Sequence, residues 1–346
     1  MTNLFEKLLR EKHTLLADGA TGTNLFAMGL QSGDAPELWN IDQPEKIAQH
    51  YRSFIDVGSD IILTNTFGGT LYRLKLHNAQ DRVAELNIAA VEILKKQIEE
   101  SGREVIIAGS IGPTGEILAP LGEMRPEEAV SAFTEQALAL KQGGADILWI
   151  ETMSSREEVE LAVKGAAMAG LPLIFTMSFD TNGRTMMGVG ASDVVALHRQ
   201  IGSHVHACGA NCGVGASEVV ATILNMKSVA TDGSEMVLVA KANCGIPEFV
   251  DGQITYSGTP EIMADYVIMA RDSGARIIGG CCGTSPEHVA AMRKALDNTP
   301  ISAPPTLDDI DRVLGKVSEG ARAQARGEHS IASRVSGRKR RRATQK

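Results

Sequence analysis

The chain has 346 residues, of which 43% are hydrophobic and 22% charged, with a formal net charge of −8. These proportions are typical of a globular protein, and no run approaches the roughly 18 apolar residues of a membrane-spanning helix. The acidic balance also argues against a nucleic-acid-binding body, so we expect neither a nucleic-acid nor a membrane partner.

The first 20 residues lack the basic, apolar and small-residue regions of a secretory signal, so a cytoplasmic location is expected. Eight short apolar runs then follow along the chain. Because they are continuous rather than alternating, they indicate strands buried on both faces, as in parallel sheets. The runs cover residues 14–20, 59–67, 104–112, 145–153, 172–180, 205–213, 235–245 and 275–283.

Helix-like stretches lie between these runs. Residues 43–58 carry apolar side chains at helical spacing, and residues 125–144 begin with Pro126 and two acids, which favour a first turn. The same pattern recurs over 155–170, 259–274 and 285–298. Eight strands alternating with helices predict a single-domain α/β fold, a (β/α)8 TIM barrel over residues 10–298. A doubly wound sheet is the alternative.

Residues 299–346 are predicted to form a C-terminal extension. It opens with a proline-rich exit, continues as one short amphipathic helix over 306–326, and ends in a disordered basic tail, since residues 301–346 hold 11 Lys/Arg against five Asp/Glu. A homo-oligomer is compatible with the sequence.

Polar residues and thiols gather at the ends of the predicted strands. In (β/α)8 barrels the active site lies at the carboxyl ends of the strands, so these residues are candidates for a site at the barrel mouth. They are Asp18-Gly19, Thr64-Asn65-Thr66, Ser110, Glu151, Asn211-Cys212, Asn243-Cys244 and Cys281-Cys282.

Three cysteines stand out at two of these strand ends. Successive side chains of a strand point to opposite faces, so Cys281 and Cys282 reach one target only if the chain turns, which Gly279, Gly280 and Gly283 allow. Barrel closure then brings them towards Cys212. Three thiolates suit Zn²⁺ and leave one tetrahedral position open. Free buried thiols or a vicinal disulfide are the alternatives.

The other candidate metal ligands are interpreted as structural. Cys208 lies inside a predicted strand and Cys244 is expected to be a packing thiol, because buried free cysteine behaves as a small hydrophobe. His204 and His206 lie at the start of a strand, which places them across the barrel from the mouth.

Several motifs resemble those of the homocysteine S-methyltransferase family, which includes betaine–homocysteine methyltransferases and the homocysteine-binding module of cobalamin-dependent methionine synthase. The resemblance covers roughly residues 10–297. The matching motifs are "DGATGT" (18–23), "TNTF" (64–67), "GSIGPTG" (109–115), "IET" (150–152), "GANC" (209–212), "NCGIP" (243–247) and "GGCCGT" (279–284).

The resemblance implies a zinc-dependent enzyme that methylates homocysteine to methionine. Cys212, Cys281 and Cys282 would hold Zn²⁺, and the homocysteine sulfur would take the open position. Glu151 corresponds to the carboxylate that binds the substrate ammonium, and Asn243 to a fourth zinc ligand when substrate is absent. The further substrate-binding residues implied are Asp18, Gly19, Ala20, Ser110 and Asn211.

The methyl donor is expected to be a small onium compound, with betaine ahead of a sulfonium such as S-methylmethionine. Aromatic walls favour such cations. The donor-site candidates are Trp39, Thr64, Asn65 and Phe67, with Tyr72, Trp149 and Phe179 as further walls. The aromatic residues of animal betaine enzymes are replaced here by Gly68-Gly69 and Thr152. The alternative is a subunit that exchanges methyl groups with a separate corrinoid protein.

Overall fold

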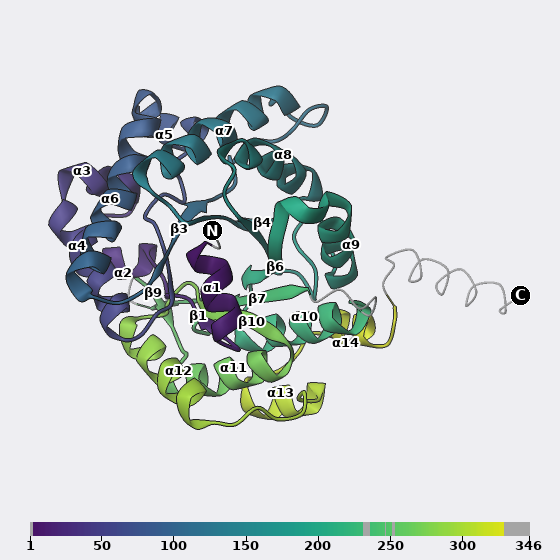
Figure 1. The fold of residues 1–346 in the computed structure, drawn as a ribbon. Helices are drawn as coiled ribbons and strands as arrows, with labels where there is room; N and C mark the ends of the chain where they lie inside the picture. Colours follow the sequence, from purple (N-terminus) through teal and green to yellow (C-terminus); the bar gives the residue numbers. More distant parts are fainter. Residues whose placement is uncertain (1–2, 231–235, 246, 251–252, 329–346) are drawn as a thin grey trace, which may run out of the picture.

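The computed structural model describes residues 3–230, 236–245, 247–250 and 253–328, and shows a ring of parallel strands surrounded by helices (Figure 1). The eight strands pair in the order β1-β10-β7-β6-β5-β4-β3-β2, and a parallel bridge between Ala17 and Ile61 joins the two ends. The predicted (β/α)8 barrel is therefore confirmed. The strands are β1 (Leu15–Leu16), β2 (Ile61–Leu63), β3 (Ile106–Ile111), β4 (Ile147–Met153), β5 (Leu173–Ser178), β6 (Val205–Cys212), β7 (Val237–Ala242) and β10 (Ala275–Gly280).

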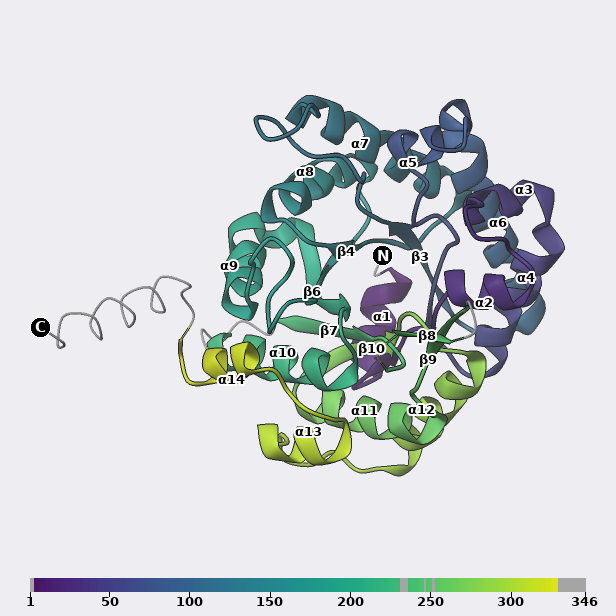
Figure 2. The ribbon, with the colours of Figure 1, turned by 180° about the vertical axis from the view of Figure 1, so that it is seen from behind.

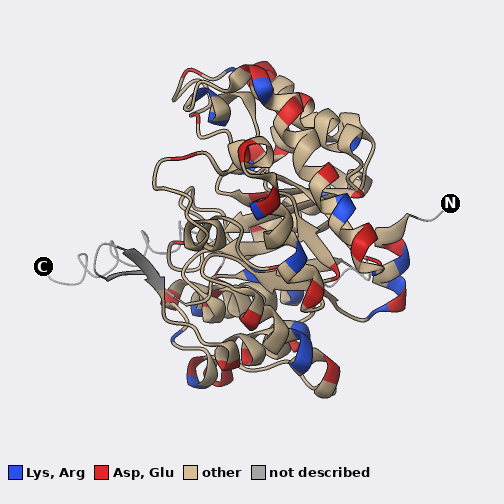
Figure 3. Cartoon of the chain, turned by 90° about the vertical axis from the view of Figure 1, so that its left-hand side faces the viewer, with Lys and Arg blue, Asp and Glu red and all other residues tan. Residues whose placement is uncertain are grey.

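Helices cover the outside of the ring, and each of the five stretches named above forms one. α4 begins at Pro44, whose fixed φ suits a first turn, and buries Ile47, Tyr51 and Phe54. Acidic and basic residues are mixed along the outer helices (Figure 3). The outer helices are α4 (Pro44–Asp56), α6 (Val83–Ser101), α7 (Pro126–Gly143), α8 (Arg156–Ala166), α9 (Ala191–Ile201), α10 (Ala216–Val229), α11 (Pro260–Asp272) and α12 (Pro286–Asn298). None of the helices in the described residues is long and apolar enough to cross a membrane.

An N-terminal helix closes one end of the barrel. α1 (Leu4–Glu11) lies over the centre of the ring (Figure 1), and its Phe5 and Leu8 pack with the inward-facing residues of the strands. Trp149 belongs to the same interior cluster and is fully buried, with its Nε1 donating to Thr176 Oγ1 at 3.1 Å. The barrel is thus packed through its middle, and its open end is where the strands finish.

Short elements decorate the mouth and the C-terminus: α2 (Gly22–Ala27), α3 (Trp39–Asp42), α5 (Leu71–Lys75), the β8–β9 hairpin (Pro247–Val250 and Gln253–Tyr256), α13 (Leu307–Val313) and α14 (Glu319–Ala325). The expected single helix over 306–326 is wrong, because the chain breaks at Gly315, whose φ is +101°. α14 packs on α10, where Asn225 Nδ2 donates to Ala321 O at 3.0 Å. The predicted disordered tail lies outside the described residues.

The packing between β6 and β7 predicts a measurable stability effect. A Cβ at Gly209 would stand 1.9 Å from Val239 O, so β7 must move to accept it. Gly209→Ala is expected to lower the free energy of unfolding by about 3 kcal/mol, the upper part of the usual range for overpacking. Urea denaturation measures this. Gly22→Ala is the control, since a Cβ there meets nothing within 4 Å, and an equal loss in both variants would contradict the prediction.

Candidate metal centre and substrate pocket

Three thiols meet at the mouth of the barrel. Cys212 is the last residue of β6, and Cys281 and Cys282 directly follow β10. Their sulfur atoms all lie within 4.8 Å of one another, and the Cys212 and Cys282 Sγ atoms are 4.0 Å apart. All five cysteines are free, including the adjacent pair.

The glycines around the pair act differently from the expectation. Only Gly283 turns the chain, with φ of +79°. Gly279 and Gly280 stay in β10 and instead make room, because a Cβ on Gly280 would stand 2.2 Å from Thr284 Cγ2. The bend that aims both sulfurs at one place therefore begins after the strand.

The donor set fits a tetrahedral zinc ion. Zn–S bonds of about 2.3 Å place thiolate sulfurs about 3.8 Å apart, close to the 4.0 Å between Cys212 and Cys282. Hydrogen bonds from Cys212, Cys281 and Tyr256 lower the pKa of Cys282 to about 3, whereas the bonds that Cys212 makes to both partners raise its own pKa. Three thiolates this close together repel one another, so a cation is needed to balance their charge.

Hydrogen bonds from two asparagines fix the backbone that carries the thiols, part of which is strained. Cys212 and Thr152 both have left-handed backbones, with φ of +58° and +61°, a conformation that persists only where neighbours enforce it. Asn211 links the two positions: Thr152 N donates to its Oδ1 at 2.9 Å, and its Nδ2 donates to Thr152 Oγ1 at 2.7 Å. Asn211 Nδ2 also lies 3.9 Å from Cys281 Sγ.

Asn243 connects the two cysteine loops. Its Oδ1 accepts from Cys282 N at 3.0 Å, and its Nδ2 donates to Gly213 O at 2.7 Å. The structure therefore gives Asn243 a positioning role, with both ends of its amide engaged. Its role as a fourth ligand stays a prediction, since its Oδ1 keeps a second lone pair beside the bond from Cys282 N.

Glu151 and Ser110 form a second polar group at the mouth. Ser110 Oγ donates to Glu151 Oε1 at 2.6 Å, and both side chains are buried. Burial raises the pKa of Glu151 to about 7, with Lys241 opposing this shift and Cys281 adding to it. A buried carboxylate poised in this way suits the binding of a cationic group.

A buried ion pair, which the sequence reasoning missed, lies beside these groups. Lys241 Nζ is 2.9 Å from Asp18 Oδ1, and both side chains are almost completely buried. Burial alone would lower the pKa of Lys241, but the negative charges of Asp18, Glu151 and Cys281 outweigh it and raise that pKa. A lysine inside the apolar run "EMVLVAKANCG" (235–245) was the available signal.

The Asp18 loop is tied into the barrel. Leu63 N donates to Asp18 Oδ2 at 2.9 Å, and Ala20 N donates to Thr284 O at 3.0 Å. A Cβ on Gly19 would stand 2.5 Å from Thr284 O, so glycine permits this close approach. The amide of Ala20, one of the substrate-binding residues implied by the resemblance, thus already donates to Thr284 O.

The predicted donor-site residues occupy structural positions. Thr64 Oγ1 accepts from Ser110 N at 3.1 Å, and Asn65 Nδ2 donates to Pro36 O at 2.7 Å, towards α3. Lys46 Nζ lies 4.4 Å from the centre of the Trp39 ring, so one face of this ring is covered. Phe67 is half-buried and packs beside Gly112.

Tyr256, at the end of β9, is a further aromatic that the sequence reasoning missed. Its hydroxyl hydrogen-bonds to Cys282, and a Cβ on Gly283 would stand 2.3 Å from its ring. The hairpin that carries it lies near α2 and β10 (Figure 2). Tyr256 is therefore an aromatic side chain in contact with the thiol cluster.

The remaining thiols and histidines are not part of the three-sulfur group, although Cys244 N donates to Cys282 O at 2.9 Å. Cys208 is buried in β6 with its Sγ 3.7 Å from Met236 Sδ, and Cys244 is also buried. His204 and His206 lie before and at the start of β6, and both line a cavity of about 300 Å³ with Asn3. These positions agree with the structural interpretation.

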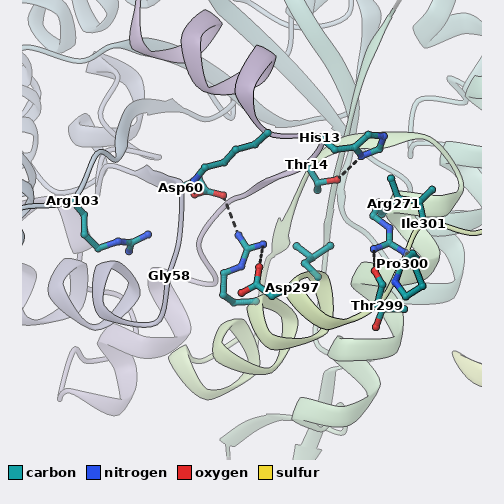
Figure 4. Close-up of a pocket in the computed structure, with 13 residues that line it drawn as sticks. His13, Thr14, Gly58, Asp60, Arg103, Arg271, Asp297, Thr299, Pro300 and Ile301 are labelled. Carbon is teal, nitrogen blue, oxygen red and sulfur yellow. Dashed lines mark hydrogen bonds and ion pairs between the residues drawn. The ribbon is translucent and has the colours of Figure 1, made fainter.

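A larger cavity, of about 680 Å³, lies at the opposite end of the barrel, before β1, β2 and β3 (Figure 4). Its charged groups largely pair with one another: Arg293 bridges Asp60 at 3.3 Å and Asp297 at 2.7 Å, and Lys12 contacts Asp60 at 2.5 Å. An ion-pair network lines this cavity and connects the N-terminal ends of the strands. The cavity is therefore separate from the thiol site.

Fold and site together define an α/β barrel with a three-thiol cluster at its mouth, next to a buried carboxylate. The chain belongs to the homocysteine S-methyltransferase family, whose family model matches residues 15–296.

Individual relatives agree with this membership. The chain is 27% identical to the methionine synthase of Mycobacterium tuberculosis and 26% identical to that of Mycobacterium leprae, over 86% of its length in both comparisons. It spans about a quarter, 26%, of the length of these relatives. Among solved structures it resembles the metallated form of the homocysteine methyltransferase MmuM from Escherichia coli, with a TM-score of 0.68 and 26% identity over 84% of this chain and 99% of that chain.

Proposed function

We propose that the protein is a zinc-dependent homocysteine S-methyltransferase that forms methionine from homocysteine and a small methyl donor. The observation that carries the proposal is the convergence of Cys212, Cys281 and Cys282 within 4.8 Å at the barrel mouth. Glu151 and Ser110 lie at the ends of the neighbouring strands β4 and β3, where an amino-acid substrate bound through its thiol would present its ammonium.

The residues of this chain then have distinct tasks. A bound zinc ion would supply a Lewis acid that keeps the substrate thiol deprotonated at neutral pH. Glu151 would hold the substrate ammonium, and Ser110 would orient Glu151. The substrate sulfur forms its new bond to the methyl carbon as the carbon–nitrogen or carbon–sulfur bond of the donor breaks. The donor keeps that electron pair and leaves as a neutral amine or sulfide, and the thiol proton goes to solvent.

Betaine or a related onium compound is the donor we favour. Aromatic faces stabilise a cationic methyl donor, and the partly exposed Tyr256, which contacts the thiol cluster, offers such a face. Trp149 cannot serve, because it is buried in the barrel interior. A small sulfonium compound fits the same chemistry.

A protein-borne methyl group is the second candidate donor. The loops after β3 and β5 carry strongly exposed apolar side chains, with Ile117 65%, Leu121 85%, Met186 73% and Met187 61% exposed. We propose that these side chains together form an interaction surface at the mouth of the barrel, since exposed apolar groups that lie together mark such sites. A separate corrinoid protein that docks on these loops would bring its methyl group to the barrel mouth.

A donor screen tests the proposed function. Zinc-loaded protein is incubated with homocysteine and, separately, betaine, dimethylsulfoniopropionate, S-methylmethionine or methylcobalamin, and methionine is measured. We expect methionine with one of the onium donors and no corrinoid protein present. Methionine with methylcobalamin alone would favour the second candidate, and failure with every donor together with no homocysteine binding would contradict the function.

The raised pKa of Glu151, about 7, predicts a pH dependence of homocysteine binding. Only the ionised carboxylate attracts the substrate ammonium, so affinity falls as the pH drops through 7 and Glu151 takes up a proton. Between pH 8 and pH 6 the ionised fraction of Glu151 falls about tenfold, and we expect its contribution to the homocysteine affinity to fall by the same factor. Because loss of the thiol proton adds its own pH dependence, we compare the wild type with Glu151→Gln by calorimetry. An affinity ratio between them that does not change with pH would contradict the prediction.

A further inference from the structure

Helix α14 packs directly against a loop at the mouth of the barrel. This loop, residues 179–190, connects β5 to α9, and we call it the β5 loop. Both ribbon views place α14 beside α10 (Figures 1 and 2). A Cβ on Gly320 would stand 1.8 Å from Asn182 O, and a Cβ on Gly183 would stand 2.6 Å from Ala321 N. The backbones of α14 and the β5 loop are therefore in contact.

Gln324 of α14 connects the first part of the β5 loop to the start of α9. Its side chain is only 3% exposed. Its Nε2 donates to Gly183 O at 2.6 Å, and its Oε1 accepts from Ala191 N at 2.9 Å. Gly320 N adds a bond to Asn182 Oδ1 at 2.7 Å. Because a buried amide is stable only when its donor and its acceptor are paired, the position of Gln324 and the loop conformation depend on each other.

The β5 loop in turn supports the strand end that carries Glu151. Thr185 is buried in the loop, and its Oγ1 donates to Ser154 O at 2.7 Å. Ser154 directly follows β4, three residues after Glu151. The start of the loop also adjoins the thiol cluster, because a Cβ on Gly213, the residue that follows β6, would stand 2.6 Å from Phe179 O. The loop therefore contacts the backbone close to the carboxylate and close to one thiol.

We propose that Gln324 is a positioning residue, which holds the β5 loop in the conformation that keeps the substrate pocket competent for homocysteine. This inference rests on the proposed function and names the contact that fixes the geometry of its pocket. Gln324 acts through the loop and through Ser154, and needs no contact with the substrate. Because the coupling between a loop and a binding site is reciprocal, homocysteine must in turn stabilise the loop. A purely structural role of Gln324 in α14 would not produce this effect.

Tryptic cleavage after Arg184, inside the β5 loop, reports how often the loop opens. In zinc-loaded Gln324→Met, which loses both hydrogen bonds, we expect this cleavage to be about 10- to 100-fold faster than in the wild type. Saturating homocysteine is expected to slow it, and calorimetry should show a homocysteine affinity at least about threefold lower. Mass spectrometry identifies the cleaved bond. An unchanged cleavage rate, an unchanged affinity, or cleavage that bound homocysteine does not slow overturns the proposal.

Arg322→Met is the matched control. Arg322 lies on the same helix, two residues before Gln324, and its Nη2 is 2.7 Å from Asp311 Oδ2 of α13 rather than bonded to the loop. The cleavage rate after Arg184 and the homocysteine affinity should both stay at their wild-type values. An equal change in both variants would assign the effect to the packing of α14 as a whole and overturn the role of Gln324.

Thr185 gives an independent test of the same path if Gln324→Met does not fold. Thr185→Val loses the hydroxyl that donates to Ser154 and keeps every residue of α14, whereas Thr185→Ser retains the hydroxyl. We expect a lower homocysteine affinity in the first variant and a near wild-type affinity in the second, and equal affinities in both contradict the proposal. If the wild type itself does not bind homocysteine, the proposed function fails. A wild type that binds homocysteine, with variants that bind it equally well, overturns only the positioning role.

Discussion

Cys281→Ala is expected to purify with almost no zinc and to form methionine at least about 1,000-fold more slowly than the wild type. The magnitude follows because even an outer-shell contact is worth 10- to 100-fold in metal affinity, and this change removes a ligand. The two remaining thiols leave two open positions in a tetrahedral set that needs three protein ligands and one substrate. Metal analysis of the purified protein and methionine formation with the active donor are the two measurements.

The matched control for this prediction is Cys208→Ala. Cys208 lies on the same strand as Cys212, four residues earlier, and is buried among apolar groups with its Sγ next to Met236. Its removal should leave zinc content near the wild-type value, with a modest loss of stability. Zinc that persists in Cys281→Ala, or disappears equally in Cys208→Ala, would contradict the assignment of ligands.

Much of the barrel was predictable because its strands are buried on both faces. Each of the eight strands falls inside a continuous apolar run, and α12 ends at Asn298, where the sequence places the end of the barrel. α1 was not expected, since its role depends on Phe5 and Leu8 reaching the barrel interior, a contact between distant residues. The break at Gly315 was missed because apolar spacing on both sides of it continues a helical pattern.

Part of the candidate site could be predicted from the sequence, namely the residues whose type alone indicates their chemistry. Three cysteines at strand ends carry such a signal on their own, whereas the role of Glu151 was implied by the resemblance and stays a prediction. Lys241 carried no such signal, because one charged residue in an apolar run looks like the end of a strand, and its meeting with Asp18 requires closure of the barrel and the missing side chain of Gly279. The hydrogen bonds by which Asn243 connects the two cysteine loops likewise depend on backbone groups that are far apart in the sequence.

Glu151→Gln is expected to retain zinc but to lower kcat/KM for homocysteine by about 100- to 1,000-fold. A buried charge that loses its partner costs about 3–5 kcal/mol, and the glutamine amide gives the substrate ammonium no counter-charge. In the proposed function Glu151 binds the amino-acid end of the substrate and not the reacting sulfur, so the loss is expected mainly in KM, with kcat changed little. Steady-state kinetics over a wide range of homocysteine concentrations separates the two constants.

Glu158→Gln is a closely matched control for the Glu151 prediction. Both glutamates are 8% exposed, and each accepts a hydrogen bond from a hydroxyl, Thr114 Oγ1 at 2.7 Å for Glu158 and Ser110 Oγ at 2.6 Å for Glu151. Glu158 lies on α8, outside the thiol corner, so its change should reduce stability and leave the KM for homocysteine as it is. A purely structural role for Glu151 predicts the same behaviour in both variants, and a large rise in KM for Glu151→Gln alone separates substrate binding from packing.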